Sequence, residues 1–218
     1  QIANKVKLMD GYDFVKLQTE IYDITGNTNA YLKPSDEDAL AGITSYSVED
    51  YRGVASSDWQ DKLFRTALTQ NYTVSVSGGS KEAGNRYNIS LSALDQDGII
   101  IRSNFQRYQG KINFQQKFGK KVTLDVLANY SRAITNGVTP TNAQAASSAT
   151  GWLMYSVWGY RPVKPLRSGK SDDLYDDLVD SEVTGANDYR FNPVKTAQNE
   201  YRKTIVDYLN ANTGLTWE

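Results

Sequence analysis

The 218-residue chain contains no cysteine and no histidine. The first absence excludes disulfides and thiol nucleophiles, and the second removes the commonest side-chain ligand of metal ions. No apolar run approaches the ~18 residues that a membrane-spanning helix needs. A formal net charge of −1 provides no basic footprint for nucleic acid, so we expect no nucleic-acid partner. We predict no catalytic residue, no metal site and no cofactor, since no nucleophile motif, phosphate-binding loop or diagnostic carboxylate spacing occurs.

What the chain does have is a sequence period of two. Four successive runs between residues 71 and 132 alternate apolar with polar residues, which predicts strands with chemically different faces. The predicted apolar face includes Tyr87, Ile89, Leu91, Ile112, Phe114, Leu124 and Val126. The predicted polar face includes Asn88, Ser90, Ser92, Lys111, Asn113, Gln115, Asp125 and Asn129. The alternation by itself fits a soluble core as well as a surface in contact with lipid.

The links between these four runs alternate in length. Residues 78–85 predict a compact hairpin turn, in which the Gly78–Gly79 pair supplies positive φ. Residues 119–121 predict a tight turn, whereas the segment 133–200 is very long. Short links on one side and long links on the other are typical of bacterial outer-membrane barrels. We therefore predict an all-β fold that forms part of a large antiparallel transmembrane barrel with long, partly helical extracellular loops.

The flanking segments complete this predicted organisation. We expect residues 1–9 to be the end of a barrel strand and residues 10–70 to be a long, partly helical connection, an extracellular loop. Residues 71–132 supply four antiparallel strands, residues 133–200 a long extracellular loop with a short aromatic helix, and residues 201–218 one further strand.

Three polar residues mark predicted helix starts in the first connection. Asp10, Ser35 and Asp58 each have the side-chain oxygen that an N-cap needs. In the helix after Asp10, we expect Phe14, Leu17 and Ile21 to form the apolar stripe.

The long loop contains the candidate binding residues. Trp152, Tyr155, Trp158 and Tyr160 cluster after an Ala- and Ser-rich stretch and could contact a ligand or a lid. The alternative is that they pack the loop against its neighbours, as buried aromatic residues usually do. The acidic residues 171–182 lack the spaced pattern of a calcium loop and are more typical of a solvated surface.

Four stretches of the sequence together match one known family: DWQDKLFRTA at 58–67, QNYTVSVSGG at 70–79, YNISLSALDQDGII at 87–100 and FQRY at 105–108. They closely resemble the SusC/RagA family of TonB-dependent transporters. Residues 192–194 (NPV) and the strand after them resemble the family's next barrel strand. The match is most specific over residues 58–132.

The resemblance implies an importer in the outer membrane of Bacteroidota, not an enzyme. Its barrel would have about 22 strands around a plugged lumen. A SusD-like surface lipoprotein would close over the barrel as a lid, TonB would supply energy through the plug, and the substrate would be an oligosaccharide or a peptide. The apolar residues named above would then face outer-membrane lipid and the polar residues would face the lumen.

Two other classes of protein remain open at this point. No plug, TonB-contacting segment or set of C-terminal strands is recognisable, and no leader precedes Gln1, so we expect either a processed chain or a fragment of a longer transporter. A passive porin or structural barrel would share the strand pattern. So would a soluble carbohydrate-binding β-sandwich, with Trp152, Tyr155 and Trp158 as its sugar platform.

Overall fold

The computed structural model describes residues 5–26, 29–137, 153–166 and 191–217. The chain divides into a helical unit, Gln1–Arg65 with Val138–Glu200, and a sheet unit, Thr66–Gly137 with Tyr201–Glu218. The helical unit contains α1 Gly11–Thr25, α2 Asp36–Leu40, the 3-10 helix η1 Val48–Tyr51, α3 Trp59–Leu63, α4 Leu153–Gly159 and α5 Pro193–Asn199. The sheet unit contains β1 Thr69–Ser80, β2 Asn85–Asp97, β3 Asn104–Phe118, β4 Val122–Asn136 and β5 Lys203–Trp217.

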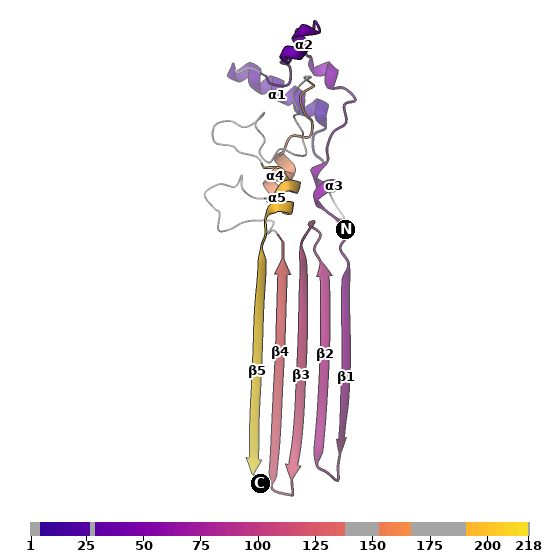
Figure 1. Ribbon diagram of the computed structural model, residues 1–218, viewed down its shortest axis with the longest axis vertical. Coiled ribbons are helices and arrows are strands. Elements are labelled where there is room, and N and C mark those ends of the chain that lie inside the picture. The colour runs from indigo at the N-terminus through magenta and orange to yellow at the C-terminus, as the bar shows by residue number, and fades with distance from the viewer. Residues whose placement is uncertain (1–4, 27–28, 138–152, 167–190, 218) are drawn as a thin grey trace. The chain divides into compact units, whose positions relative to one another are not determined.

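The five strands form one sheet whose spatial order is the order of the sequence (Figure 1). All four pairings are antiparallel and run without interruption along the strands. The prediction of an antiparallel sheet is therefore confirmed. In Figure 1 the β1–β2 and β3–β4 turns lie at one end of the sheet, and the β2–β3 connection lies at the other.

The first hairpin turn differs from the prediction. Gly78 and Gly79 lie inside β1, where they pair with Tyr87 and Arg86, and the turn itself is formed by residues 81–84. The positive φ of 65° belongs to Gly84. The sequence was misleading because both glycines are needed for close packing within the strand rather than for a turn.

The side chain opposite Gly78 explains why a glycine occupies this position of β1. A Cβ atom built at Gly78 would lie 2.6 Å from the Tyr87 hydroxyl oxygen, so the tyrosine ring extends across the glycine. At Gly79 a Cβ would lie 2.5 Å from the backbone carbonyl oxygen of Asn85. An aromatic ring that covers a glycine on the neighbouring strand helps to hold strand register.

In the helical unit the predicted caps are confirmed. The Asp10 side chain accepts a hydrogen bond from the Asp13 amide at the start of α1, and Gly26 ends the helix in the left-handed conformation. Ser35 and Asp58 cap α2 and α3 in the same way.

The predicted apolar stripe of α1 is confirmed for Phe14 and wrong for Leu17 and Ile21. The buried face consists of Gly11, Phe14, Val15 and Gln18, whereas Leu17 and Ile21 are exposed. Tyr31, Tyr51 and Val163 pack against Phe14 and Val15, so tertiary contacts rotate the buried face toward Val15.

The core of the helical unit joins segments far apart in the sequence. The Tyr31 hydroxyl donates to the Val163 carbonyl oxygen (3.2 Å), and the Tyr51 hydroxyl donates to the Tyr31 carbonyl oxygen (2.7 Å). The indole N–H of Trp59 donates to the Arg161 carbonyl oxygen at 3.0 Å. Each buried ring thus places its polar atom on a backbone acceptor, as buried tyrosine and tryptophan generally do.

The described residues at the N-terminus do not form the expected strand. Residues 5–10 have no strand assignment. The Val6 amide and carbonyl bond to the Gln60 side chain, and Lys5 forms an ion pair with Asp61. The two bonds to Gln60 occupy backbone groups of Val6 that a strand would use in a ladder. Within the described part of the chain, no helix is long and apolar enough to cross a membrane.

Candidate functional site

The register of the sheet assembles the apolar residues of different strands into continuous rows. One row contains Val76, Ile89, Ile112, Ala128 and Ala211, and the next contains Gly78, Tyr87, Phe114, Val126 and Thr213. Each of the seven residues predicted to be apolar-facing lies on this one face. We call it the apolar face.

The middle of the apolar face has no charged residue. The rows from Val74 to the end of the sheet at Trp217, all of them described, contain no Asp, Glu, Lys or Arg on this side. Large apolar side chains here are exposed to solvent: Val74 is 68% exposed, Leu91 62% and Leu215 71%. An exposed, uncharged apolar surface of this extent indicates a surface meant to be covered.

Aromatic residues lie at both ends of this uncharged region. Tyr72, Tyr108 and Tyr130 lie toward the β2–β3 connection, and Phe118 and Trp217 lie toward the β3–β4 turn. All five are exposed. Rings at both boundaries of an apolar band are typical of strands that cross a membrane.

The opposite face is polar. The eight residues predicted to be polar-facing all lie on it, in rows such as Ser90–Lys111–Asn129. Near the β3–β4 turn, the Gln115 side chain donates a 2.7 Å hydrogen bond to the Asp125 carboxylate. A depression toward the β1–β2 turn is lined by Ser77, Gly79, Arg86, Lys111, Lys117 and Asp125. Basic side chains thus outnumber acidic ones around it, which suits acidic or hydrogen-bonding partners.

An ion pair on the apolar face lies just beyond the uncharged rows. The Arg132 guanidinium donates to both carboxylate oxygens of Asp207, at 2.7 and 3.0 Å, and the Tyr130 hydroxyl donates to the same carboxylate at 2.8 Å. Asp207 belongs to β5, opposite Arg132 in register. The sequence pattern showed an acid among apolar residues but gave no sign of this partner, 75 positions away.

The four aromatic residues predicted to touch ligand or lid have different environments. Trp152 lies outside the described residues. Tyr155 is half-buried and Trp158 is 51% exposed, so Trp158 has surface available for a partner. Tyr160 is 3% exposed and meets Trp59 edge to face, with ring centroids 5.1 Å apart. The prediction is corrected for Tyr160, because core packing occupies its ring.

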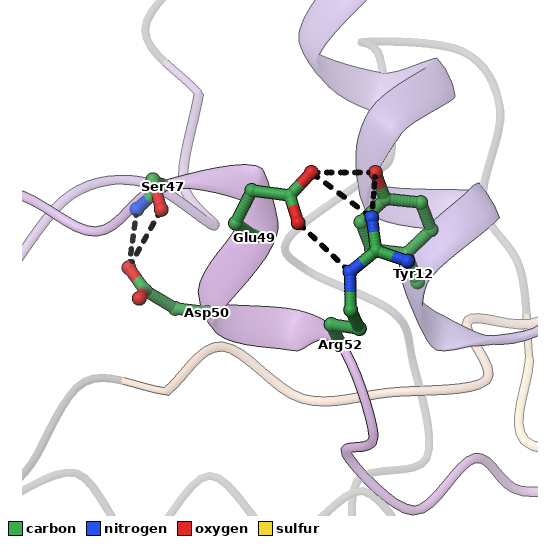
Figure 2. A network of polar contacts seen from close by, with 5 residues as sticks. All are labelled: Tyr12, Ser47, Glu49, Asp50 and Arg52. Atoms are coloured by element: carbon green, nitrogen blue, oxygen red, sulfur yellow. Dashed lines mark hydrogen bonds and ion pairs between the residues drawn. The ribbon is translucent and has the colours of Figure 1, made fainter.

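An exposed polar cluster links α1 to η1 in the helical unit (Figure 2). Tyr12 donates to Glu49 at 2.8 Å, Arg52 donates to both carboxylate oxygens of Glu49, and the Arg52 guanidinium lies 4.5 Å from the centre of the Tyr12 ring. The hydrogen bonds from Arg52 and then from Tyr12 hold the pKa of Glu49 below its usual value. Donation to Glu49 raises the pKa of Tyr12 above its ordinary range. The cluster stabilises local structure and resembles no acid–base pair.

The described residues contain no group of acidic, histidine or cysteine side chains able to hold a metal ion. The acidic stretch 171–182, for which calcium was considered, lies outside the described residues, as does most of the segment before α4.

Two known proteins with similar sequences are named as TonB-dependent receptors. No model of a known family matches the chain. The TonB-dependent receptor SusC of Bacteroides thetaiotaomicron is 41% identical over 66 residues, which cover 30% of this chain and 6% of that protein. The TonB-dependent receptor P3 of Formosa agariphila is 30% identical over 128 residues, 58% of this chain and 12% of that protein. The chain therefore matches a small part of the length of each relative.

A solved structure shares the fold. A structure of the RagAB peptide transporter matches the whole of this chain and 25% of its own, with a TM-score of 0.58 and 22% identity. The fold and sequence comparisons together confirm the resemblance seen in the sequence: this chain is like part of a SusC/RagA-type TonB-dependent transporter. The similar proteins are named as receptors and transporters, not as enzymes.

Proposed function

We propose that this chain forms part of the wall of an outer-membrane β-barrel, of about 22 strands, in a TonB-driven importer. The observation that supports it most is the uncharged, exposed apolar face of a single antiparallel sheet. In this proposal the apolar face contacts lipid and the polar face lines the lumen. Residues 10–65 and 138–200 then belong to extracellular loops.

The height of the apolar face agrees with a bilayer. Tyr108 and Phe118 mark its two ends on β3 and are about ten residues apart, or roughly 34 Å along an antiparallel strand. At a barrel tilt of about 40° this is a height of roughly 26 Å, close to the ~25 Å apolar band of outer-membrane barrels. The short turns then lie at the periplasmic end and the long connections at the extracellular end.

A soluble β-sandwich is less well supported. A sandwich buries its apolar face against a second sheet, and the described strands form one sheet with that face open. β1 and β5 are its two edges and each offers unpaired backbone groups. In lipid such edges must be paired, so we propose that further strands continue the sheet on both sides.

The partners and substrate follow from the family resemblance. We propose a SusD-like surface lipoprotein as lid, TonB as the energy source and an oligosaccharide or peptide as substrate. The similarity to SusC and to a transporter named for peptide supports this class. Trp158, exposed in the helical unit, is the proposed contact for lid or ligand among the described aromatic residues.

The first test is the intact mass and composition of the native particle that contains this chain. We expect it to require detergent for extraction, to have a polypeptide several-fold heavier than 24.4 kDa, and to co-purify with a surface lipoprotein. A water-soluble protein without a lipoprotein would refute the proposal.

Uptake by intact cells distinguishes an importer from a passive barrel. Cells that express the full protein should take up labelled oligosaccharide or peptide with TonB and lose this uptake when TonB is deleted. Uptake that continues at the same rate without TonB would indicate a porin.

A further inference from the structure

The apolar face contains a notch where its uncharged rows end, next to the Arg132–Asp207 ion pair. Gly110 has no side chain between its cross-strand partners Leu91 and Tyr130, so the space above its backbone is left open. The residues of the apolar face that line the notch include Tyr72, Leu91, Ala93, Tyr108, Gly110 and Tyr130. Its volume of about 460 Å³ falls within the ~300–1,000 Å³ range of small-ligand sites.

Polar groups border the notch on one side only. In the same row as Tyr108, one row from Gly110, Arg132 lies opposite Tyr108 and pairs with Asp207. The guanidinium has five N–H donors, and the bonds to Asp207 use two of its nitrogen atoms. Further along the same face, Gln106 donates to Asp95 at 3.1 Å. In the other direction the notch opens onto the uncharged row that contains Val76 and Ile112.

We propose that this notch holds one membrane lipid, with an acyl chain over Gly110 and the headgroup phosphate at Arg132. The inference rests on the proposed barrel, because only a lipid-facing surface brings acyl chains to Gly110. The apolar lining matches a hydrocarbon chain, and the tyrosine hydroxyls and Arg132 lie where a headgroup begins.

Arg132 is suited to the phosphate. Guanidinium groups bind phosphate through several N–H donors in one plane. Asp207 fixes the guanidinium in place and leaves its remaining donors for a ligand. Since the Arg132–Asp207 pair has no net charge, its role is directional hydrogen bonding rather than long-range attraction.

The test uses the full detergent-solubilised protein and native mass spectrometry with phosphatidylglycerol as the lipid probe. The wild type should retain one lipid after micelle removal. Gly110→Leu fills the notch and should lower the retained fraction about tenfold, the scale of a chain displaced by one or two methylenes. A leucine fits the backbone here, because a Cβ at Gly110 meets its nearest atom, Leu91 Cδ2, at an ordinary 3.4 Å.

Two matched variants separate the site from general lipid coating. Ala211→Leu adds the same bulk on the apolar face away from the notch and should leave retention unchanged. The double variant Arg132→Gln, Asp207→Asn keeps a neutral polar pair and should weaken phosphatidylglycerol retention about tenfold, as for loss of a hydrogen bond to a charged group. Retention of diacylglycerol, which has no phosphate, should be the same in the double variant as in the wild type.

Equal lipid retention by wild type and Gly110→Leu would overturn the lipid site while leaving the barrel intact. So would equal losses in Gly110→Leu and Ala211→Leu, or binding of inorganic phosphate alone that is sensitive to the double variant. A protein that needs no detergent would overturn both the barrel and the lipid site. The two failures are therefore distinguishable.

Discussion

The helical unit and the sheet unit place their aromatic residues in opposite ways. Trp59, Tyr31 and Tyr51 in the helical unit are at most 1% exposed, and their polar atoms bond to the backbone. In the sheet unit, Tyr72 is 61% and Trp217 75% exposed. The helical unit thus buries its aromatic residues within its own fold, whereas the sheet unit leaves the apolar side chains of one face exposed. A solvent-exposed sheet of this kind would aggregate in water.

The strongest test of this contrast is the removal of a core ring. Trp59→Ala should destabilise the helical unit by about 3–5 kcal/mol, because it leaves a cavity beside Tyr160 and frees the Arg161 carbonyl. Hydrogen exchange in the intact protein should show a matching loss of protection in α3. Trp158→Ala, at an exposed ring of the same unit, should change stability by less than about 0.5 kcal/mol. Comparable effects would mean that the buried core does not control this unit.

The second test places charge on the two faces of the sheet. Val126→Arg should cost about 2–4 kcal/mol, because it puts a guanidinium near the middle of the uncharged face. Ser90→Arg, on the polar face, should be tolerated far better. The measurement is urea unfolding of the full protein from lipid vesicles. Equal tolerance on both faces would remove the distinction between lipid and lumen.

A smaller effect is expected for the contact between Tyr87 and Gly78 on neighbouring strands of the sheet. Tyr87→Ala uncovers Gly78 and should cost about 0.2–1 kcal/mol, the usual scale of a cross-strand pair. Gly78→Ala should also destabilise the sheet, since its Cβ would meet the Tyr87 hydroxyl. In the double variant the two costs should be less than additive when urea unfolding is measured. Strict additivity would show that the ring and the glycine do not interact.

The smallest expected effect concerns pH in the helical unit. The pKa of Glu49 is lowered by Arg52 and Tyr12, so its stabilising contribution is complete above the ordinary glutamate pKa and disappears as pH falls through the lowered value. Amide protection in η1 should therefore decrease slightly between about pH 6 and about pH 3. Glu49→Gln should show low protection with little pH dependence. An unchanged pH profile in that variant would assign the effect to another group.

The sequence predicted those features that depend on near neighbours. The strand pattern follows from a period of two, and the caps at Asp10, Ser35 and Asp58 act within three residues. The buried face of α1 was not predictable, because Val163, far away in the chain, selects Val15 rather than Leu17.

The candidate site shows the same limit. Membership of each sheet face was predictable from alternation, but the contact of Arg132 with Asp207 depends on the register between β4 and β5. Tyr160 was expected at a binding surface, and only its packing on Trp59 places it in the core. The notch at Gly110 needs four strands in register, so a glycine in one strand gave no signal by itself.

The hydrogen bond that closes the long connection between β4 and β5 has a consequence for how this fold can diversify. The Gly137 amide donates to the Arg202 carbonyl at 3.0 Å, so the segment between them leaves β4 and returns to the adjacent β5 at the same level. The entropy of closing a loop grows only with the logarithm of its length, about 0.6 kcal/mol for each doubling. Material between these two residues can therefore be lengthened, shortened or exchanged at small cost to the pairing of β4 with β5. Selection can therefore change this segment while β4 and β5 keep their register.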